Sequence, residues 1–309
     1  MRLKFSVQLP VDRVEALSEF GTSEAISEIA TAIEGAGFDA CFVTEHPFPT
    51  DRWLERGGHH AFDPFVALAV AAAATRTLRL HTNILVFPYR NPFLIAKGIA
   101  SLDVVSNGRV IVGAGAGYLG GEFAALGASF DDRNERFDDA LVAMQAAWAG
   151  ESVAMSMPGF TAEGNTMRPR PIQRPRPPIW IGGNSPRAIR RAVDFADGWS
   201  PFPLPAVAAG HARSTGLESL DDLRGGIARL RDYAEMQGRD SPLDVNFVPF
   251  GLPMNVSSLP QDDVLHEQFS ALEAAGVTWI SLGMPTASRG SYLESVARFG
   301  ETFLSSRTI

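Results

Sequence analysis

Short runs of apolar and β-branched residues alternate with helical patterns along the chain. Runs such as LKFSVQL (3–9) are typical of strands, and each is followed by a longer segment that predicts a helix. Repeated strand–helix units predict parallel strands joined by right-handed crossovers. The expected strands are 3–9, 39–44, 78–86, 109–117, 178–183, 197–200, 243–251 and 277–283, and the expected helices are 23–37, 63–75, 91–106, 133–150, 185–196, 219–237, 262–275 and 290–304.

Eight such units predict one closed (β/α)8 barrel, a TIM barrel, as a single domain over 1–309. Such a barrel needs roughly 250 residues, and we expect the surplus mainly as an insertion at about 151–177, before the fifth strand. The proline-rich RPRPIQRPRPP (168–178) is interpreted as an extended arm that leads into that strand. An open doubly wound sheet is the alternative, although such sheets usually have fewer strands.

Several expected helices open on a capping residue. Ser23 is the candidate N-cap of the first helix. Asp63, Asn91 and Ser185 each precede a proline, which suits the first position of a helix. These caps fix where the predicted helices begin.

The composition narrows the class of protein. With 45% hydrophobic and 20% charged residues, the 309-residue chain is expected to fold around a sizeable core. A net charge of −8 disfavours a nucleic-acid partner, because such binding relies on clustered Lys and Arg. Cys41 is the only cysteine, so no intrachain disulfide can form. The start of the sequence does not read as a signal peptide and the longest apolar stretch (65–75) is too short to span a bilayer, so we expect a cytoplasmic protein without a membrane partner.

The second expected strand runs into FVTEHP (42–47), where an apolar run meets an acid, a histidine and a proline. The carboxyl ends of barrel strands form the active face, so Glu45 and His46 are expected at the barrel mouth. An acid beside a histidine suits proton transfer near neutral pH. The alternative is that both residues only cap the loop after the strand.

A glycine-rich segment, VIVGAGAGYLGG (110–121), follows the fourth expected strand. Gly115 and Gly117 begin a formal G-x-G-x-x-G, but three strand–helix units precede it and no helix is expected before about 133. We therefore interpret these glycines as backbone kept small for the approach of a flat ligand.

A second glycine pair follows the fifth expected strand. Gly182, Gly183, Asn184 and Ser185 open the next helix and are a candidate phosphate cradle, because helix N-termini bind anions. The alternative is an ordinary tight turn between strand and helix.

Neither a metal site nor a hydrolytic nucleophile is expected. His46, His59, His60 and His81 could bind a metal, but the first strand lacks a His-x-His motif and a single cysteine does not support structural zinc. The sequence contains no G-x-S-x-G nucleophile elbow.

Four segments together resemble the luciferase-like monooxygenase superfamily, and within it the coenzyme F420-dependent (deazaflavin) oxidoreductases. The resemblance covers about residues 1–200. It implies a (β/α)8 barrel holding a flavin-like ring across its mouth, F420 as cofactor, hydride transfer to or from a small organic substrate, and a homodimer. The segments are FVTEHP (42–47), NILVFPYRNPFLIAKGIASLDVVSNGRVIVGAGAGY (83–118), ALVAMQAAW (140–148) and RPRPIQRPRPPIWIGGNSPRAIRRAVDFADGW (168–199).

The resemblance also implies roles for single residues. His46 falls on the family's catalytic histidine, and Glu45 falls on the acidic neighbour that contacts the ring. Asn83 and Ile84 fall on a bulge in the third strand, with a cis peptide bond, that backs the ring. Tyr118 replaces an acid of the related sugar-phosphate dehydrogenases, so neither their acid–base pair nor their substrate carries over. The resemblance places the phosphate at Gly182, Gly183 and Asn184, and we expect Ser185 to bind the cofactor beside them. Gly115 and Gly117 are expected to contact the cofactor because their backbone is small, and Gln8 and Tyr118 are expected near the substrate.

Two alternative functions remain open. An FMN-dependent monooxygenase of the same superfamily is the first, because a Glu-His pair after the second strand is also found there. A barrel that binds a flavin or deazaflavin without turnover is the second, and the replacement at Tyr118 keeps it open.

Overall fold

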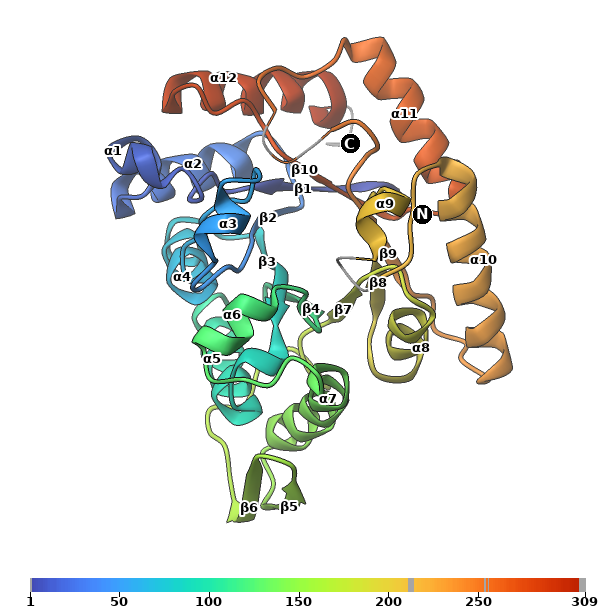
Figure 1. Ribbon diagram of the computed structural model, residues 1–309. Helices are drawn as coiled ribbons and strands as arrows, with labels where there is room; N and C mark the ends of the chain where they lie inside the picture. Colours follow the sequence, from blue (N-terminus) through green and yellow to red (C-terminus); the bar gives the residue numbers. More distant parts are fainter. Residues whose placement is uncertain (1, 211–213, 253, 255, 306–309) are drawn as a thin grey trace.

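The structure, a computed structural model, describes residues 2–210, 214–252, 254 and 256–305. Eight parallel strands close into a barrel with helices on its outside (Figure 1), which confirms the predicted (β/α)8 fold. The order around the barrel is β1 (Lys4–Gln8), β10 (Trp279–Leu282), β9 (Asp244–Phe247), β8 (Gly198–Ser200), β7 (Ile179–Gly182), β4 (Val110–Gly115), β3 (Arg79–Val86) and β2 (Ala40–Val43).

Eight longer helices lie close to the predicted ranges, and short elements follow several strands. The part of the chain that is described contains no helix long and apolar enough to cross a membrane. The longer helices are α2 (Ser23–Gly35), α4 (Pro64–Ala74), α5 (Pro92–Val105), α7 (Arg133–Ala149), α8 (Pro186–Phe195), α10 (Leu220–Met236), α11 (Asp262–Ala275) and α12 (Arg289–Phe299). The short elements are η1 (Val14–Ala16), α1 (Leu17–Phe20), α3 (Asp51–Leu54), η2 (Phe87–Tyr89), α6 (Gly120–Ala125), α9 (Ala206–Ala209) and the π-helical η3 (Gly300–Leu304).

An antiparallel hairpin outside the barrel lies between α7 and β7. It comprises β5 (Val153–Met157) and β6 (Phe160–Asn165), and it projects away from the barrel in Figure 1. The proline-rich arm then returns to the barrel, where the buried Asp103 carboxylate accepts hydrogen bonds from the backbone N–H groups of Ile172 (2.7 Å) and Gln173 (3.0 Å). The interpretation of the arm as extended was wrong, because residues 168–169 and 172–177 form bends and the Arg168–Pro169 and Arg174–Pro175 peptide bonds are cis.

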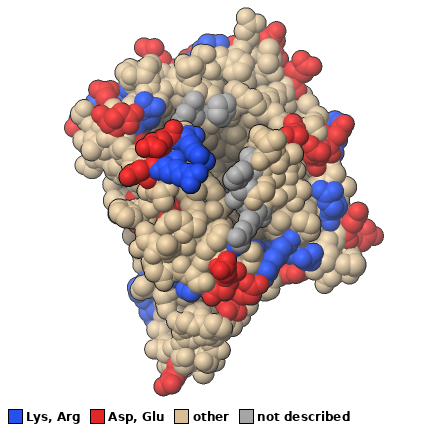
Figure 2. All heavy atoms as spheres, viewed as in Figure 1, with Lys and Arg blue, Asp and Glu red and all other residues tan. Residues whose placement is uncertain are grey.

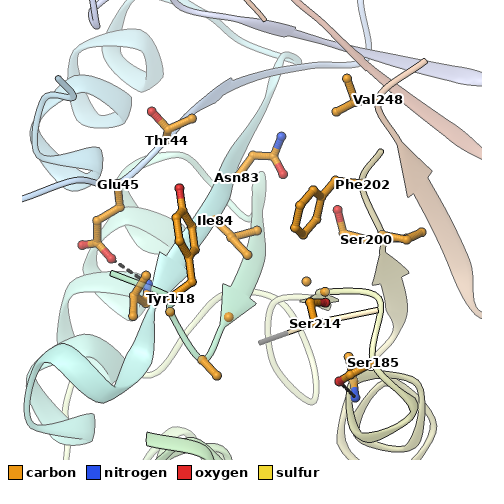
Figure 3. A pocket seen from close by; sticks show the side chains of 18 of the residues that line it. Thr44, Glu45, Asn83, Ile84, Tyr118, Ser185, Ser200, Phe202, Ser214 and Val248 are labelled. Atoms are coloured by element: carbon orange, nitrogen blue, oxygen red, sulfur yellow. Dashed lines mark hydrogen bonds between the residues drawn. The ribbon is translucent and has the colours of Figure 1, made fainter. Parts of the chain in front are cut away.

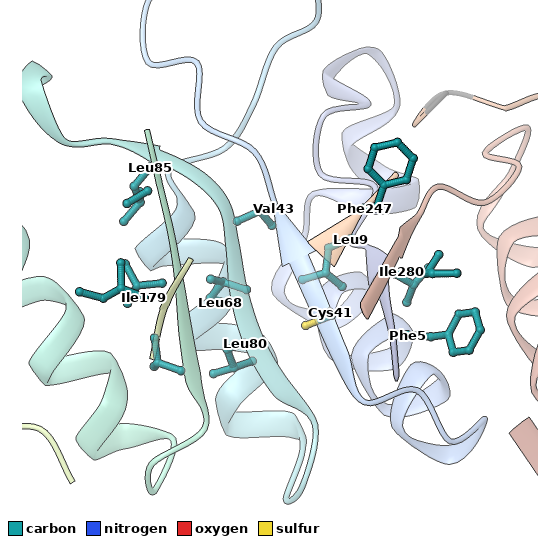
Figure 4. Close-up of a cluster of buried hydrophobic side chains, with 14 of the residues drawn as sticks. Phe5, Leu9, Cys41, Val43, Leu68, Leu80, Leu85, Ile179, Phe247 and Ile280 are labelled. Carbon is teal, nitrogen blue, oxygen red and sulfur yellow. The ribbon is translucent and has the colours of Figure 1, made fainter. Parts of the chain in front are cut away.

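The main core lies between the strands and the surrounding helices. Phe5, Cys41, Leu80 and Ile280 are fully buried or nearly so, and Figure 4 shows them on neighbouring strands. Strands buried on both faces read as continuous apolar runs, which is why the sequence located them. Burial also lowers the pKa of His81, on β3, to about 3, so this histidine is neutral.

Side-chain caps set the starts of six barrel helices, two of which, α10 and α12, begin at capping boxes on Ser219 and Ser288. Asp63, Asn91 and Ser185 accept hydrogen bonds from backbone N–H groups of the first turns of α4, α5 and α8, as predicted. The prediction for the first helix was wrong by one residue. Thr22, and not Ser23, caps α2 by accepting a hydrogen bond from the N–H of Ala25.

Strand β3 is interrupted by a bulge near its carboxyl end. Its pairing with β4 shifts register between Thr82 and Leu85, and the Asn83–Ile84 peptide bond is cis, which confirms the predicted bulge. The Ile84 side chain extends over glycines of β4 and β7. A Cβ atom added to Gly115 would lie 2.7 Å from Ile84 Cδ1, and one added to Gly182 would overlap the same atom. The lack of a side chain at Gly115 and Gly182 therefore leaves room for Ile84, a role that the sequence alone did not reveal.

We predict that Gly182→Ala destabilises the fold by about 1–3 kcal/mol, because the added methyl group overpacks against Ile84 Cδ1. Ile84→Val removes that atom, so the double variant should recover most of the loss. Chemical denaturation of the four proteins of this double-mutant cycle measures the coupling. Gly35→Ala is the control, because a Cβ there meets no atom within 4 Å. Additive effects of the two substitutions would contradict this packing.

Candidate active site

A cavity of about 790 Å³ opens at the carboxyl ends of the barrel strands. The space-filling view shows this face hollowed at its centre (Figure 2). Active sites of TIM barrels lie on this face, where loops from different strands meet. Its lining includes Glu45 and His46 after β2, Asn83 and Ile84 on β3, Gly115 at the end of β4 with Gly117 and Tyr118 beyond it, and Gly182 at the end of β7 with Gly183 and Ser185 beyond it.

His46 is held by a buried acid from outside its own loop. The Nδ1 atom of His46 lies 3.3 Å from Oε2 of Glu122, on α6. The hydroxyl group of Tyr89 donates to the same oxygen (2.8 Å), and the backbone N–H of Phe48 donates to Oε1 (3.1 Å). Burial raises the pKa of Glu122, but the hydrogen bonds from His46, Tyr89 and Phe48 outweigh burial and lower it below its ordinary value. Glu122 is therefore an ionised acceptor.

This contact fixes the tautomer of His46. A carboxylate accepts hydrogen bonds, so Nδ1 of His46 carries the hydrogen and Nε2 carries the lone pair. An imidazole oriented in this way can accept a proton at Nε2, and the charge that forms is stabilised by Glu122. The arrangement therefore makes His46 a general base at the cavity wall, or the corresponding acid once it is protonated.

Glu122 was missed in the sequence because no helix was expected before about residue 133. That expectation was wrong, since the short helix α6 spans Gly120–Ala125. Its few residues carry too little apolar periodicity to predict a helix. The available signal was an acid four positions after Tyr118, in YLGGE, next to the glycine-rich turn.

Glu45 lies on the cavity wall, but its carboxylate is engaged away from His46. Its Oε2 accepts a hydrogen bond from the backbone N–H of Val86 (2.6 Å), and its Oε1 pairs with the guanidinium of Arg90. Burial raises the pKa of Glu45, and Arg90 and the Val86 N–H oppose that rise. The structure therefore pairs His46 with Glu122, whereas Glu45 ties the end of β2 to the end of β3. Figure 3 shows Glu45 and Tyr118 on the same side of the cavity.

Aromatic rings surround His46 on the side of the β2–α4 loop. The ring centroid of His46 lies 4.4 Å from that of Trp53, 4.9 Å from that of His59 and 6.2 Å from that of Tyr118. Burial lowers the pKa of His59.

In the part of the chain that is described, no three His, Cys, Asp or Glu side chains are grouped as metal ligands would be.

The opposite end of the cavity carries arginines from α7 and α8. Arg133, Arg187 and Arg191 line it together with Ser185, the N-cap of α8. The Nη2 atom of Arg187 lies 2.6 Å from Oδ2 of Asp138, and Arg191 pairs with the other oxygen of the same carboxylate. This end presents cationic groups and the start of a helix, a combination that favours anions.

Two predicted site residues lie outside the cavity lining. The side chain of Asn184 is buried and holds a loop, because its Nδ2 donates to the carbonyl oxygens of Phe202 (2.9 Å) and Thr215 (3.0 Å). Gln8 is buried as well, and its carbonyl oxygen accepts a hydrogen bond from the hydroxyl of Tyr292 (2.5 Å). Lining residues that the sequence did not indicate include Ser200, Phe202, Val248, Leu252 and Met254.

The comparisons with known proteins agree on one family. Residues 3–280 match the family model described as luciferase-like monooxygenase. The chain is 34% identical over 305 residues to the F420-dependent glucose-6-phosphate dehydrogenase of Beutenbergia cavernae, and the match covers 85% of this chain and 88% of that protein.

Two solved structures share the fold over 98% of each chain. One is an F420-dependent secondary alcohol dehydrogenase in complex with an F420–acetone adduct (TM-score 0.73, 17% identity). The other is the oxygenating constituent of 3,6-diketocamphane monooxygenase from Pseudomonas putida in complex with FMN (TM-score 0.74, 14% identity). On the strength of the family-model match and the relative from Beutenbergia cavernae, this chain belongs to the luciferase-like monooxygenase family.

Proposed function

We propose that the protein is an F420-dependent oxidoreductase that transfers a hydride between deazaflavin and a small organic substrate. The observation that carries the proposal is His46, which Glu122 holds with its Nε2 lone pair available at the wall of a large cavity at the barrel mouth. The F420-dependent relative at 34% identity supports the choice of cofactor.

The cavity fits the parts of this cofactor. Ile84, raised on the bulge of β3, offers an apolar surface for one face of a flat ring, and Figure 3 shows it between Asn83 and Tyr118. Gly182, Gly183 and Ser185 at the start of α8 would hold the phosphate, because backbone N–H groups at a helix N-terminus bind anions. The neighbouring arginines, Arg187 and Arg191, suit an anionic tail.

Bound F420 supplies a carbon that can donate or accept a hydride. His46 would take the proton from a substrate hydroxyl during oxidation, or return it to a carbonyl oxygen during reduction. Trp53 and Tyr118, beside the His46 ring, would limit the access of water to that proton. Beyond them Phe202, Val248 and Leu252 contribute apolar wall, so we propose an uncharged substrate.

An FMN-dependent monooxygenase is the second candidate. The FMN-bound structure from Pseudomonas putida shares the fold, although at 14% identity it supports the barrel and not the cofactor. The homodimer also remains a proposal. Val66 on α4 and Leu94 and Val105 on α5 are apolar, more than 60% exposed, and offer a surface for it.

Anaerobic titration should show that the protein binds both oxidised and reduced F420 at micromolar concentration and binds FMN more weakly. The arginines and the start of α8 provide the physical reason, because they match an anionic tail. Absorbance and fluorescence of each cofactor report binding. Reduced F420 mixed with cyclohexanone, and oxidised F420 mixed with glucose 6-phosphate as a charged comparison, then test turnover. Tight FMN binding without F420 binding would favour the monooxygenase.

We predict that His46→Asn lowers the rate of F420-dependent turnover about 10²–10⁴-fold while the free energy of unfolding changes by about 1 kcal/mol or less. The asparagine amide can replace Nδ1 as the donor to the buried Glu122, but it cannot accept a proton as Nε2 does. His46→Ala is the less suitable variant, because it leaves Glu122 without that donor. Stopped-flow absorbance of the cofactor and thermal denaturation measure the two effects, and a fully active His46→Asn protein would remove His46 from the mechanism.

A further inference from the structure

We propose that His59 is a proton-relay residue that passes protons between His46 and solvent. This inference rests on the proposed function, because it concerns the proton that accompanies hydride transfer. His59 lies in the loop between β2 and α4 and lines the same cavity as His46.

The backbone fixes the tautomer of His59. Its Nδ1 atom lies 2.8 Å from the carbonyl oxygen of His60. A carbonyl can only accept a hydrogen bond, so Nδ1 carries the hydrogen and Nε2 carries the lone pair. His59 therefore presents a proton acceptor that is not used in holding its own loop.

The imidazole rings of His59 and His46 are arranged edge to face, with ring centroids 4.9 Å apart and an interplanar angle of 85°. The Nδ1 atom of His46 is engaged by Glu122, so only its Nε2 atom exchanges protons. At this separation one water molecule could carry a proton from one ring to the other. Trp53 lies against both rings, at 4.4 Å from His46 and 5.6 Å from His59.

The loop that carries His59 leads to the surface. His59 is half-buried, whereas residues 55–57 and His60 are exposed. A cofactor and a substrate that fill the cavity would separate His46 from bulk water, and His59 would then be its nearest contact with solvent.

Three titratable neighbours set the charge state of His59. Burial is the largest effect and lowers the pKa of His59, and the hydrogen bond to the carbonyl oxygen of His60 opposes it. The charged forms of His46 and His60 lower the pKa further, and Glu122 raises it. A neutral His59 can accept a proton from His46, and its lowered pKa then favours release of that proton to water.

Over one turnover the relay takes one proton from the substrate and releases one proton to solvent. Oxidation of an alcohol would move the hydroxyl proton to Nε2 of His46, and the electron pair of the C–H bond would leave as hydride, which F420 would accept. The Nε2 proton of His46 then passes to Nε2 of His59 and from there to solvent. Both histidines return to the neutral form, and reduction of a ketone follows the same steps in reverse.

NMR titration of the cofactor-free protein tests the shared proton. With ¹⁵N-labelled histidines, the pKa of His59 in the unaltered chain should lie below its ordinary value, because burial and the charged form of His46 oppose its protonation. In His46→Asn, the titration of His59 should move to higher pH, whereas His266→Gln, on α11, should leave it unchanged. An identical His59 titration with and without His46 would overturn the relay.

Turnover in dilute buffer provides the second measurement. With F420 and cyclohexanol as substrates, His59→Gln should lower kcat about 10- to 100-fold without changing the KM for F420, and added imidazole should restore the rate. A normal rate in dilute buffer, or a lost rate that imidazole does not restore, would count against the relay. Absence of F420 binding by the unaltered chain would instead refute the proposed function, and the NMR titration would still decide whether the histidines share a proton.

Discussion

The site depends on the burial of two carboxylates just beyond the carboxyl ends of β2 and β4. Glu45 and Glu122 are 4% and 0% exposed, and a buried carboxylate is stable only if hydrogen bonds and positive charge replace its lost hydration. Glu45 meets this need with Arg90 and the N–H of Val86, which connects β2 to β3. Glu122 meets it with His46, Tyr89 and Phe48, which connects the loop after β2 to α6 and η2. The orientation of His46 follows from this requirement.

Local sequence patterns predicted the barrel well because each strand and each helix start is marked by residues that lie close together in the chain. Apolar runs marked strands buried on both faces, and cap–proline pairs such as Asp63 and Pro64 marked helix starts. The bulge at Asn83 and Ile84 could be predicted only from the family resemblance, since β propensity favours a regular strand there. Packing between residues that are far apart in the chain could not be predicted from these local patterns. The sequence shows that residue 182 is a glycine, but not that the space above it belongs to Ile84, far away in the chain.

The same limit applies to the candidate site. His46 was predicted because it ends a strand, but its partner Glu122 lies 76 residues further on, in a helix too short to show periodicity. Asn184 belongs to a plausible anion-binding segment by sequence, yet its side chain turns inward to hold the loop at Phe202 and Thr215. The resulting cavity has arginines and a helix start at one end and histidines with aromatic rings at the other. This separation suits a ligand that is anionic at one end and reactive at the other.

The central claim is that Glu122 holds His46 with a hydrogen on Nδ1 and a lone pair on Nε2. The most direct test is a ¹⁵N–¹H correlation spectrum of the histidine rings at neutral pH, compared between the unaltered chain and Glu122→Gln. The account predicts a protonated Nδ1 and an unprotonated Nε2 for His46 in the unaltered chain, and a mixture of tautomers in the variant. A His46 that carries its hydrogen on Nε2 in the unaltered chain would contradict the account.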